Sequence, residues 1–438
     1  MKKNKIIAGL FWKLAERIGA QGVNFIVSII LARLLSPEEY GLVALTTIFI
    51  SISNVFIERG FETALIQKKN ADDLDFSSVF YCNMMISIIM YSLIFFCAPL
   101  IANFYNNTEL VLVLRILGLS VLIAGVKSIQ QAYVYKNMLF KKFFASTLIG
   151  TIISAVVGVW MAYKGCGVWA LVAQQLTNMT IDTIILWITV KWRPIFAFSL
   201  GRLRELFKFG WRMLCSGLMD AFYNELYGLT IGKFYNTAQL AYYNKANQIP
   251  KLLMTNIDGS ISTVMLPALA SEQDHKEKVK SMVRRAIKTS TFLLFPMMFG
   301  LAAISEQLIR LLLTEKWLPS VPLMQLLCFS YALWPIHSIN LQAISANGRS
   351  DIFLRLEIIK KLINYPFIEQ LKDILPCLLL SLFMYIIVLC LNFITMNYII
   401  KLIIQILLGM VIYIGAQIIL KTEEFMYFVT KRGKGIQL

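Results

Sequence analysis

The first long apolar stretch of the chain reads FWKLAERIGAQGVNFIVSIILARLLSPEEYG, residues 11–41, and it combines two features that conflict. Its length and apolar content are those of a helix that crosses a membrane. The hydrocarbon core of a bilayer disfavours charged and amide side chains, so such residues within a span indicate a polar surface in the membrane. The first half of this stretch alone contains five of them, Lys13, Glu16, Arg17, Gln21 and Asn24.

The composition of the whole chain is that of a membrane protein. Of its 438 residues, 58% are hydrophobic and only 15% are charged; a soluble domain has about half apolar and about a quarter charged residues. Apolar runs long enough to span a bilayer recur from end to end, which predicts an all-α polytopic membrane protein. The net charge of +17 could indicate a nucleic-acid partner. Its clustering in every second loop instead favours cytoplasmic loops, and no nucleic acid is expected.

The loops between the apolar runs alternate in charge. With the N-terminal MKKNK in the cytoplasm, the even-numbered loops carry the Lys and Arg residues, and the odd-numbered loops, such as SPEEY and KGCG, are short and nearly free of them. This asymmetry predicts that both termini face the cytoplasm. We expect about twelve membrane spans. They lie at about 9–35, 38–59, 76–102, 109–135, 143–163, 166–190, 207–233, 237–268, 284–313, 320–346, 374–396 and 398–420.

The two halves of the chain resemble each other when the sequence is shifted by 200 residues. NFIVSIILARLLSPEEYGLVAL (24–45) then lies over NELYGLTIGKFYNTAQLAYYNK (224–245) without a gap, with Ser36 on Asn236. Two equivalent lobes around a shared cavity are a common transporter plan. We therefore expect a first lobe at 1–200 with six spans, a second lobe at 201–366 with four spans, and a terminal pair of spans with a cytoplasmic tail at 367–438.

The second lobe is shorter than the first. After its fourth span, ANGRSDIFLRLEIIKKLI leads almost directly into NYPFIEQLKDILP. Residues 350–366 are too charged and too few to cross the bilayer, so an amphipathic helix at the membrane surface is the better interpretation. One hairpin of two spans is thus missing relative to the first lobe.

Polar residues form equivalent stripes in the two lobes, because side chains three or four positions apart share a helix face. We interpret the stripes as the walls of a water-filled cavity; the alternative is that the polar residues pair with one another across a tight bundle. Arg59, at the end of the second span, and polar residues of the eighth and tenth spans, such as Asn247, Asp258, His337, Asn340 and Gln342, would add to this cavity. The stripes are Lys13, Arg17, Gln21, Asn24 and Ser28 in the first span and Arg212, Ser216, Asp220, Asn224 and Tyr227 in the seventh.

The sequence contains no motif that is typical of an enzyme or of a metal site. The seven cysteines contain no C-x-x-C pair and the two histidines lie far apart, so neither a metal site nor a redox pair is expected. No P-loop, G-x-S-x-G or H-E-x-x-H motif occurs. We expect no cofactor, no enzymatic activity and no ATPase subunit.

Several segments together resemble polysaccharide exporters of the Wzx type, nearest the colanic-acid exporter branch of the multidrug/oligosaccharidyl-lipid/polysaccharide flippase superfamily. These segments are LARLLSPEEYGLVAL, IERGFETALIQKKNADDLDFSSVFYCN, KGCGVWALVAQQL and LTEKWLPSVPLMQLL with ISANGRSDIFLRLEIIKK. The resemblance implies a two-lobed, MATE-like fold that usually has fourteen spans. This chain departs from the plan at the junction KKLI|NYPF, where one hairpin is absent.

The resemblance implies a flippase that moves undecaprenyl-pyrophosphate-linked oligosaccharide across the bacterial inner membrane for surface polysaccharide. Arg17, Arg212 and Arg59 are then candidates for binding the pyrophosphate, because guanidinium groups suit phosphate. Expected partners are the lipid-linked substrate, membrane lipids, a polysaccharide polymerase and a chain-length regulator. Alternatives are a multidrug or small-solute cation antiporter, a membrane enzyme such as a polymerase, and a truncated homologue that does not transport. The candidate cavity residues are Arg17, Gln21, Asn24, Arg59, Arg212, Asp220, Asn224 and Tyr227.

Overall fold

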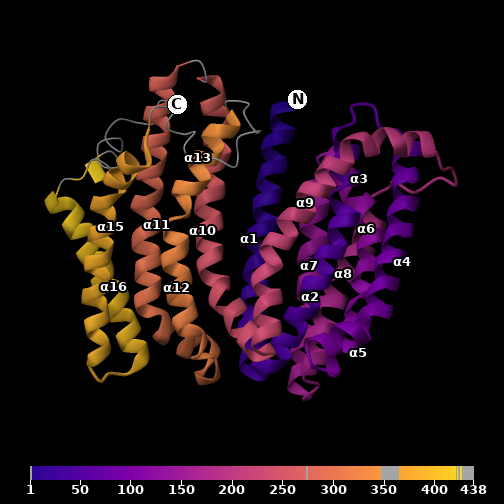
Figure 1. Cartoon of the computed structure of the whole chain (residues 1–438). Helices are drawn as coiled ribbons and strands as arrows, with labels where there is room; N and C mark the ends of the chain where they lie inside the picture. The colour runs from indigo at the N-terminus through magenta and orange to yellow at the C-terminus, as the bar shows by residue number, and fades with distance from the viewer. Residues whose placement is uncertain (1, 273–274, 347–364, 421, 423–424, 427–438) are drawn as a thin grey trace. The chain divides into compact units, whose positions relative to one another are not determined.

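The computed structural model describes residues 2–272, 275–346, 365–420, 422 and 425–426. All regular structure in these ranges is helical (Figure 1). The chain forms two compact units, Met1–Ala241 and Tyr242–Leu438, each described here by itself. The predicted domain limits at 200 and 366 follow the sequence repeat and stay a prediction. The predicted surface helix at 350–366 lies, except for its last two residues, outside the described residues.

The first unit is a bundle of nine helices and the first residues of a tenth among the residues described. Most of its buried side chains are apolar and come from α2, α4, α5, α6 and α8. The helices are α1 (Lys2–Leu34), α2 (Pro37–Glu58), α3 (Phe61–Gln67), α4 (Asp73–Phe104), α5 (Glu109–Leu117), α6 (Leu119–Lys136), α7 (Phe140–Tyr163), α8 (Val168–Thr189), α9 (Leu200–Phe234) and α10 (Thr237–Ser271).

The second unit begins within α10 and packs its other helices around α11, whose apolar face is buried along its length. Phe295 and Phe299 of this face are in the core, and Phe299 makes edge contacts with Phe329 and Tyr385. The remaining elements are α11 (Lys276–Leu313), η1 (Glu315–Trp317), α12 (Ser320–Ala332), α13 (Trp334–Ala346), α15 (Phe367–Cys390), η3 (Leu391–Phe393) and α16 (Tyr398–Leu420).

The predicted spans correspond to helices. Among the described residues, eight helices are long and apolar enough to cross a membrane by length and composition. The other predicted spans are also helical but are more polar or shorter: α1, α8, α9 and the pair α12 and α13. The predicted span at 109–135 is one of the eight, although its helix is interrupted at Gly118 between α5 and α6. The predicted span at 320–346 is divided at Leu333 into α12 and α13.

The SPEEYG turn follows from the chemistry of its residues. The backbone N–H of Ser36 donates to Glu39 Oε2 (2.7 Å), and that of Glu39 donates to Ser36 Oγ (3.3 Å), which is a capping box. Pro37 occupies the first helical position, where a missing N–H costs nothing. Gly41 is required because a Cβ there would lie 1.8 Å from the carbonyl oxygen of Thr237. The turn therefore both starts α2 and packs against the start of α10.

The sequence repeat is confirmed at this turn. Helix α1 ends at Leu34 and α9 at Phe234, while α2 begins at Pro37 and α10 at Thr237. Asn236, which the repeat places over Ser36, accepts a hydrogen bond from the backbone N–H of Gln239 through Oδ1 (2.8 Å). Both residues thus cap the helix that follows.

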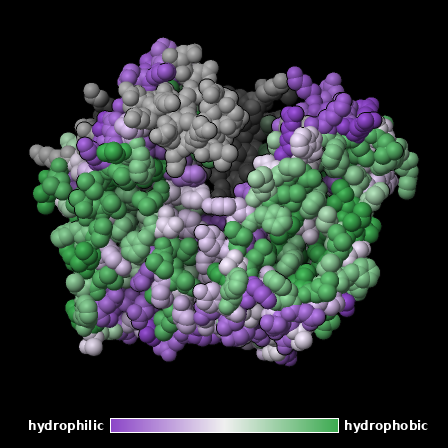
Figure 2. All heavy atoms as spheres, viewed as in Figure 1, coloured by the Kyte–Doolittle hydropathy of each residue, from purple (hydrophilic) through white to green (hydrophobic). Residues whose placement is uncertain are grey.

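Loops that the charge pattern assigned to one side of the membrane meet at one end of the first unit. Lys136 Nζ donates to the carbonyl oxygens of Leu65 and Lys68, and Arg202 pairs with Asp72. At the other end, Lys233 donates to the carbonyl oxygen of Phe104. Figure 2 shows the same division, with hydrophilic residues at the ends of each unit and hydrophobic residues between. The alternation of the loops is confirmed within this unit; which end faces the cytoplasm stays a prediction.

Candidate functional site

The polar face of α9 (Arg212, Ser216, Asp220, Asn224 and Tyr227) is exposed along its whole length. The amide of Asn224 donates to the carbonyl oxygen of Asp220 (2.8 Å) and to its Oδ1 (3.2 Å). The guanidinium of Arg212 lies 5.8 Å from the ring centre of Trp211. The side chains of this face are therefore accessible to a bound molecule.

The glycine face of α9 (Gly210, Gly217, Gly228 and Gly232) holds the helix against α2 and its end. A Cβ on Gly210 would lie 2.6 Å from the carbonyl oxygen of Gly60, and a Cβ on Gly228 would lie 2.7 Å from Ile48 Cδ1. Small residues let helices approach closely in a membrane. Figure 1 shows α9 running beside α2 and α3. This packing fixes the orientation of α9 and leaves much of its polar face uncovered.

Arg59 lies next to this helix. It follows the last residue of α2, and its backbone N–H donates to the carbonyl oxygen of Val55 (3.0 Å). Its side-chain carbons contact α9, since a Cβ on Gly217 would lie 3.0 Å from Arg59 Cγ. Arg59 is exposed. The first unit thus places Arg59 against the part of α9 that lies between Arg212 and Asp220.

The polar stripe of α1 is described in part. Gln21 and Asn24 are exposed, and Ser28 is half-buried. The carbonyl oxygen of Ser28 accepts a hydrogen bond from the Tyr40 hydroxyl (3.4 Å). The side chains of Lys13 and Arg17 lie outside the described residues, although α1 includes both positions.

Several polar residues that we expected to line a cavity form hydrogen bonds with neighbouring helices of the second unit, and their place in a cavity stays a prediction. The Tyr331 hydroxyl donates to Asn247 Oδ1 (2.7 Å), and Ser338 donates to Asp258. The amide of Asn340 donates to Gln370 Oε1 (2.8 Å), and that of Gln342 donates to Ser262. These bonds tie α10 to α12 and α13, and α13 to α15. His337 remains exposed.

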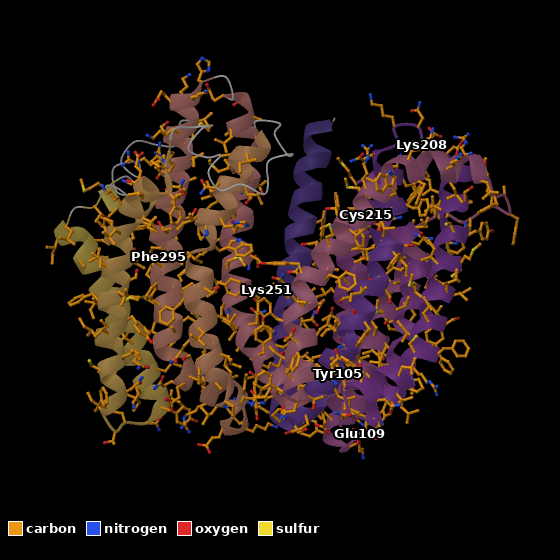
Figure 3. All side chains as sticks on the ribbon, in the orientation of Figure 1. Tyr105, Glu109, Lys208, Cys215, Lys251 and Phe295 are labelled. Atoms are coloured by element: carbon orange, nitrogen blue, oxygen red, sulfur yellow. The ribbon has the colours of Figure 1, made fainter. Side chains whose placement is uncertain are left out.

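Two intramembrane features were not predicted. Lys127 of α6 and Asp182 of α8 form an ion pair of 2.6 Å, and their side chains are only 16% and 6% exposed. Asp182 Oδ1 has no hydrogen-bond partner among the residues described. Lys251 lies about midway along α10, directly after Pro250, and is exposed (Figure 3). The available signal was a charged residue inside an apolar run, because such residues are costly in a membrane.

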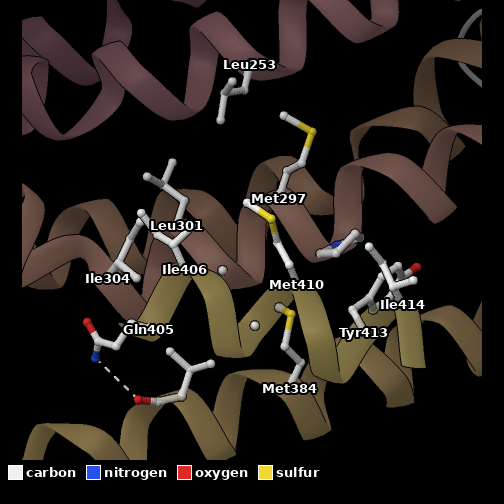
Figure 4. A pocket seen from close by; sticks show the side chains of 14 residues that line it. Leu253, Met297, Leu301, Ile304, Met384, Gln405, Ile406, Met410, Tyr413 and Ile414 are labelled. Atoms are coloured by element: carbon white, nitrogen blue, oxygen red, sulfur yellow. Dashed lines mark hydrogen bonds between the residues drawn. The ribbon is translucent and has the colours of Figure 1, made fainter. Parts of the chain in front are cut away.

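The second unit also contains an apolar cavity of about 420 Å³ (Figure 4). Met297 and Leu301 of α11, Met384 of α15 and Met410 of α16 line it. Gln405 is at its edge, and its amide donates to the carbonyl oxygen of Val388 (3.3 Å). Across the described part of the chain, no cluster of three or more His, Cys, Asp or Glu residues has a metal-binding arrangement.

The sequence matches one protein family and several known proteins of polysaccharide biosynthesis. The model of the polysaccharide biosynthesis protein family matches residues 30–322. The teichuronic acid biosynthesis protein TuaB of Bacillus subtilis (strain 168) is 26% identical over 302 residues, which are 68% of this chain and 62% of TuaB. The lipopolysaccharide biosynthesis protein WzxC of Escherichia coli (strain K12) is 22% identical over 372 residues, 83% of this chain and 74% of WzxC. The chain thus spans less than two thirds of the length of TuaB.

The fold resembles a solved structure of the lipid II flippase MurJ in an inward closed conformation. The TM-score is 0.72 at 18% identity, over 94% of this chain and 98% of the MurJ chain. This likeness confirms the predicted all-α polytopic membrane fold. The resemblance to polysaccharide exporters is confirmed as well, because the family model covers more than half of the sequence. The chain belongs to the polysaccharide biosynthesis protein family.

Proposed function

We propose that the chain is a flippase that moves an undecaprenyl-pyrophosphate-linked oligosaccharide from the cytoplasmic to the outer leaflet of a bacterial inner membrane. The product would serve surface polysaccharide synthesis. The observation that carries the proposal is the exposed polar face of α9, held in place by the glycine face of the same helix. Family membership and the MurJ-like fold support it.

The substrate has an apolar tail, a pyrophosphate and a polar glycan, and only the tail is compatible with the hydrocarbon core. Polar groups of the protein have to replace the water around the pyrophosphate and the glycan. Arg212 and Arg59, together with Arg17, are suited to the pyrophosphate, since guanidinium groups form paired, charge-assisted hydrogen bonds with phosphate oxygens.

The sugars need a different set of partners. Gln21 and Asn24 of α1 and Asn224 of α9 offer amide donors and acceptors, and Tyr227 offers a hydroxyl and an aromatic face. All four side chains are exposed. Asp220 is the acidic member of the polar face, and we assign it either to an arginine in one conformational state or to a coupling cation.

The energy for transport need not come from ATP. An inside-negative membrane potential favours outward movement of an anion by about 2.3 kcal/mol per charge per 100 mV. In this proposal both termini are cytoplasmic, which places the charged end of the first unit at the cytoplasmic leaflet. A polysaccharide polymerase and a chain-length regulator would act on the product at the outer leaflet.

The test is glycan export by a strain that lacks its own exporter. Arg212→Ala removes a charge-assisted hydrogen bond worth about 1.5–3 kcal/mol, so we expect export to fall about tenfold to a hundredfold. Met219→Ala on the same helix is the matched control, because Met219 is 76% exposed and apolar. Export that is equal in the two variants would refute the pyrophosphate role. No export by the unchanged chain would favour a truncated homologue that does not transport.

A multidrug or small-solute cation antiporter is the second candidate. The observation that favours it is the buried pair of Lys127 and Asp182, because buried charges in membrane proteins often mark ion pathways. An antiporter would protect cells against toxic cations, whereas a flippase would restore surface polysaccharide. Protection by the unchanged chain without any polysaccharide would decide for the antiporter.

A further inference from the structure

A row of three cations lies on the exposed side of the first half of α9. Arg204, Lys208 and Arg212 are spaced four residues apart, and all three are exposed. Figure 3 labels Lys208 in the part of α9 near its beginning. Four residues of helix rise about 6 Å, so the row extends over about 12 Å along the helix axis. We call these three residues the basic row.

The basic row is not neutralised by ion pairs among the described side chains. Glu205, the acidic residue in this part of α9, pairs with Lys68 at the end of α3 instead (3.2 Å). Arg202 pairs with Asp72 (3.1 Å) and Asp75 (3.4 Å). Like charges four residues apart on a helix repel each other. The basic row therefore has no ion-pair partner among the described side chains, and an anionic ligand would relieve the repulsion between its charges.

The aromatic residues between these cations indicate that the row lies near the level of the lipid headgroups. Phe207 and Trp211 are 48% and 45% exposed on the same part of α9. Trp and Tyr are enriched where the membrane meets water, so Trp211 is the residue that indicates this level. The row thus starts among the charged loops and ends at Arg212, the first residue of the polar face of α9.

We propose that the basic row is an entry site for the diphosphate group of a lipid, which moves along it from the membrane surface toward the polar face of α9. A diphosphate has enough charge and oxygen atoms to bind two neighbouring cations at once. It can exchange the pair Arg204 and Lys208 for the pair Lys208 and Arg212 in a single step of one helical turn. This inference rests on the proposed function, because it assigns the entry step of that transport.

The alternative is nonspecific: these cations would anchor the helix to any anionic lipid surface, as basic residues near a membrane commonly do. The two explanations differ in selectivity. An anchor would bind phosphatidylglycerol and a diphosphate lipid in proportion to their charge. An entry site would prefer the diphosphate, because its two phosphates fit two adjacent cations.

The experiment measures binding of farnesyl diphosphate, farnesyl monophosphate and phosphatidylglycerol to the purified full chain in detergent micelles. Arg204→Gln/Lys208→Gln is compared with Lys69→Gln/Lys276→Gln, which removes the same charge at two other exposed lysines. We expect the first variant to bind farnesyl diphosphate about tenfold more weakly than the control, with little change for phosphatidylglycerol. Arg204→Lys/Lys208→Arg keeps both charges and should restore most of the binding.

Each result supports or overturns the proposal. Equal affinity of the two glutamine variants for farnesyl diphosphate would overturn the entry site, and so would an equal loss for all three lipids. If the unchanged chain binds no farnesyl diphosphate, the proposed function fails together with the entry site; if it binds but the row makes no difference, only the entry site fails. Single Arg204→Gln and Lys208→Gln variants answer the same question if the double variant does not fold.

Discussion

The contact between α9 and the end of α2 can be tested by adding one carbon atom. In Gly210→Ala, the new Cβ would lie 2.6 Å from the carbonyl oxygen of Gly60 and 3.0 Å from its carbonyl carbon. Ordinary contacts begin at 3.4 Å, so the helices have to separate by about 0.8 Å or bend. Because the atoms that clash belong to the backbone, no side chain can rotate away to relieve the strain.

The size of the effect follows from two opposing terms. Overpacking costs about 1–3 kcal/mol, whereas replacing glycine by alanine within a helix gains about 0.8–1 kcal/mol. Gly22→Ala in α1 is the matched control, because a Cβ there has no neighbour within 4 Å and only the gain applies. The two variants should therefore differ in free energy of unfolding by about 1–3 kcal/mol.

The assay is unfolding in mixed dodecyl maltoside and SDS micelles, followed by tryptophan fluorescence. A lower SDS midpoint for Gly210→Ala than for Gly22→Ala supports the contact. Equal midpoints would show that α9 does not pack against Gly60, and the argument for its exposed polar face would lose its structural basis.

Three further predictions concern the first unit. Asp182→Asn leaves Lys127 buried without its carboxylate, so we expect the free energy of unfolding to fall by about 3–5 kcal/mol in the same assay. Lys127→Met/Asp182→Leu should recover most of this loss. A loss below about 1 kcal/mol in the single variant would contradict a buried pair. Ser36→Ala removes half of the capping box and should cost about 1 kcal/mol, whereas Ser36→Gly should cost only a few tenths; equal losses would argue against the cap. The backbone N–H of Asp75 lowers the pKa of Asp72. The stability from ionised Asp72 is therefore present above the ordinary aspartate pKa of about 3.9 and is lost as the pH falls through the lowered pKa. Asp72→Asn should make the free energy of unfolding depend less on pH in the acid range, and an unchanged dependence would contradict the assignment.

Much of the fold was predictable because membrane helices have strong local signals. Length and hydropathy identified the helical spans, and the alternation of charge identified which loops meet at one end of the first unit. The repeat located the turn after Phe234 exactly two hundred positions after the turn at Leu34. The breaks at Gly118 and Leu333 were missed, because the backbone of both residues stays in the helical region. The second break had a signal in the sequence, since Pro335 stands in the first turn of α13.

The candidate site was less predictable, since a stripe of polar residues does not show what it faces. Arg212, Asp220 and Asn224 are exposed, whereas Asn247 and Asp258, which follow the same kind of pattern, bond to neighbouring helices. The difference lies in the partner helices, which the pattern of one helix does not reveal. The glycine face of α9 was visible in the sequence as small residues and indicates which side of the helix is buried.

The central claim is that the polar face of α9 is accessible to water within the membrane. The direct measurement is labelling of single cysteines by a membrane-impermeant maleimide, with the seven native cysteines replaced. Cysteines at Ser216, Asp220 and Asn224 should react, whereas a cysteine at Leu45, which is fully buried, should not. Labelling at none of the three positions on α9, in a protein that still folds, would contradict the account.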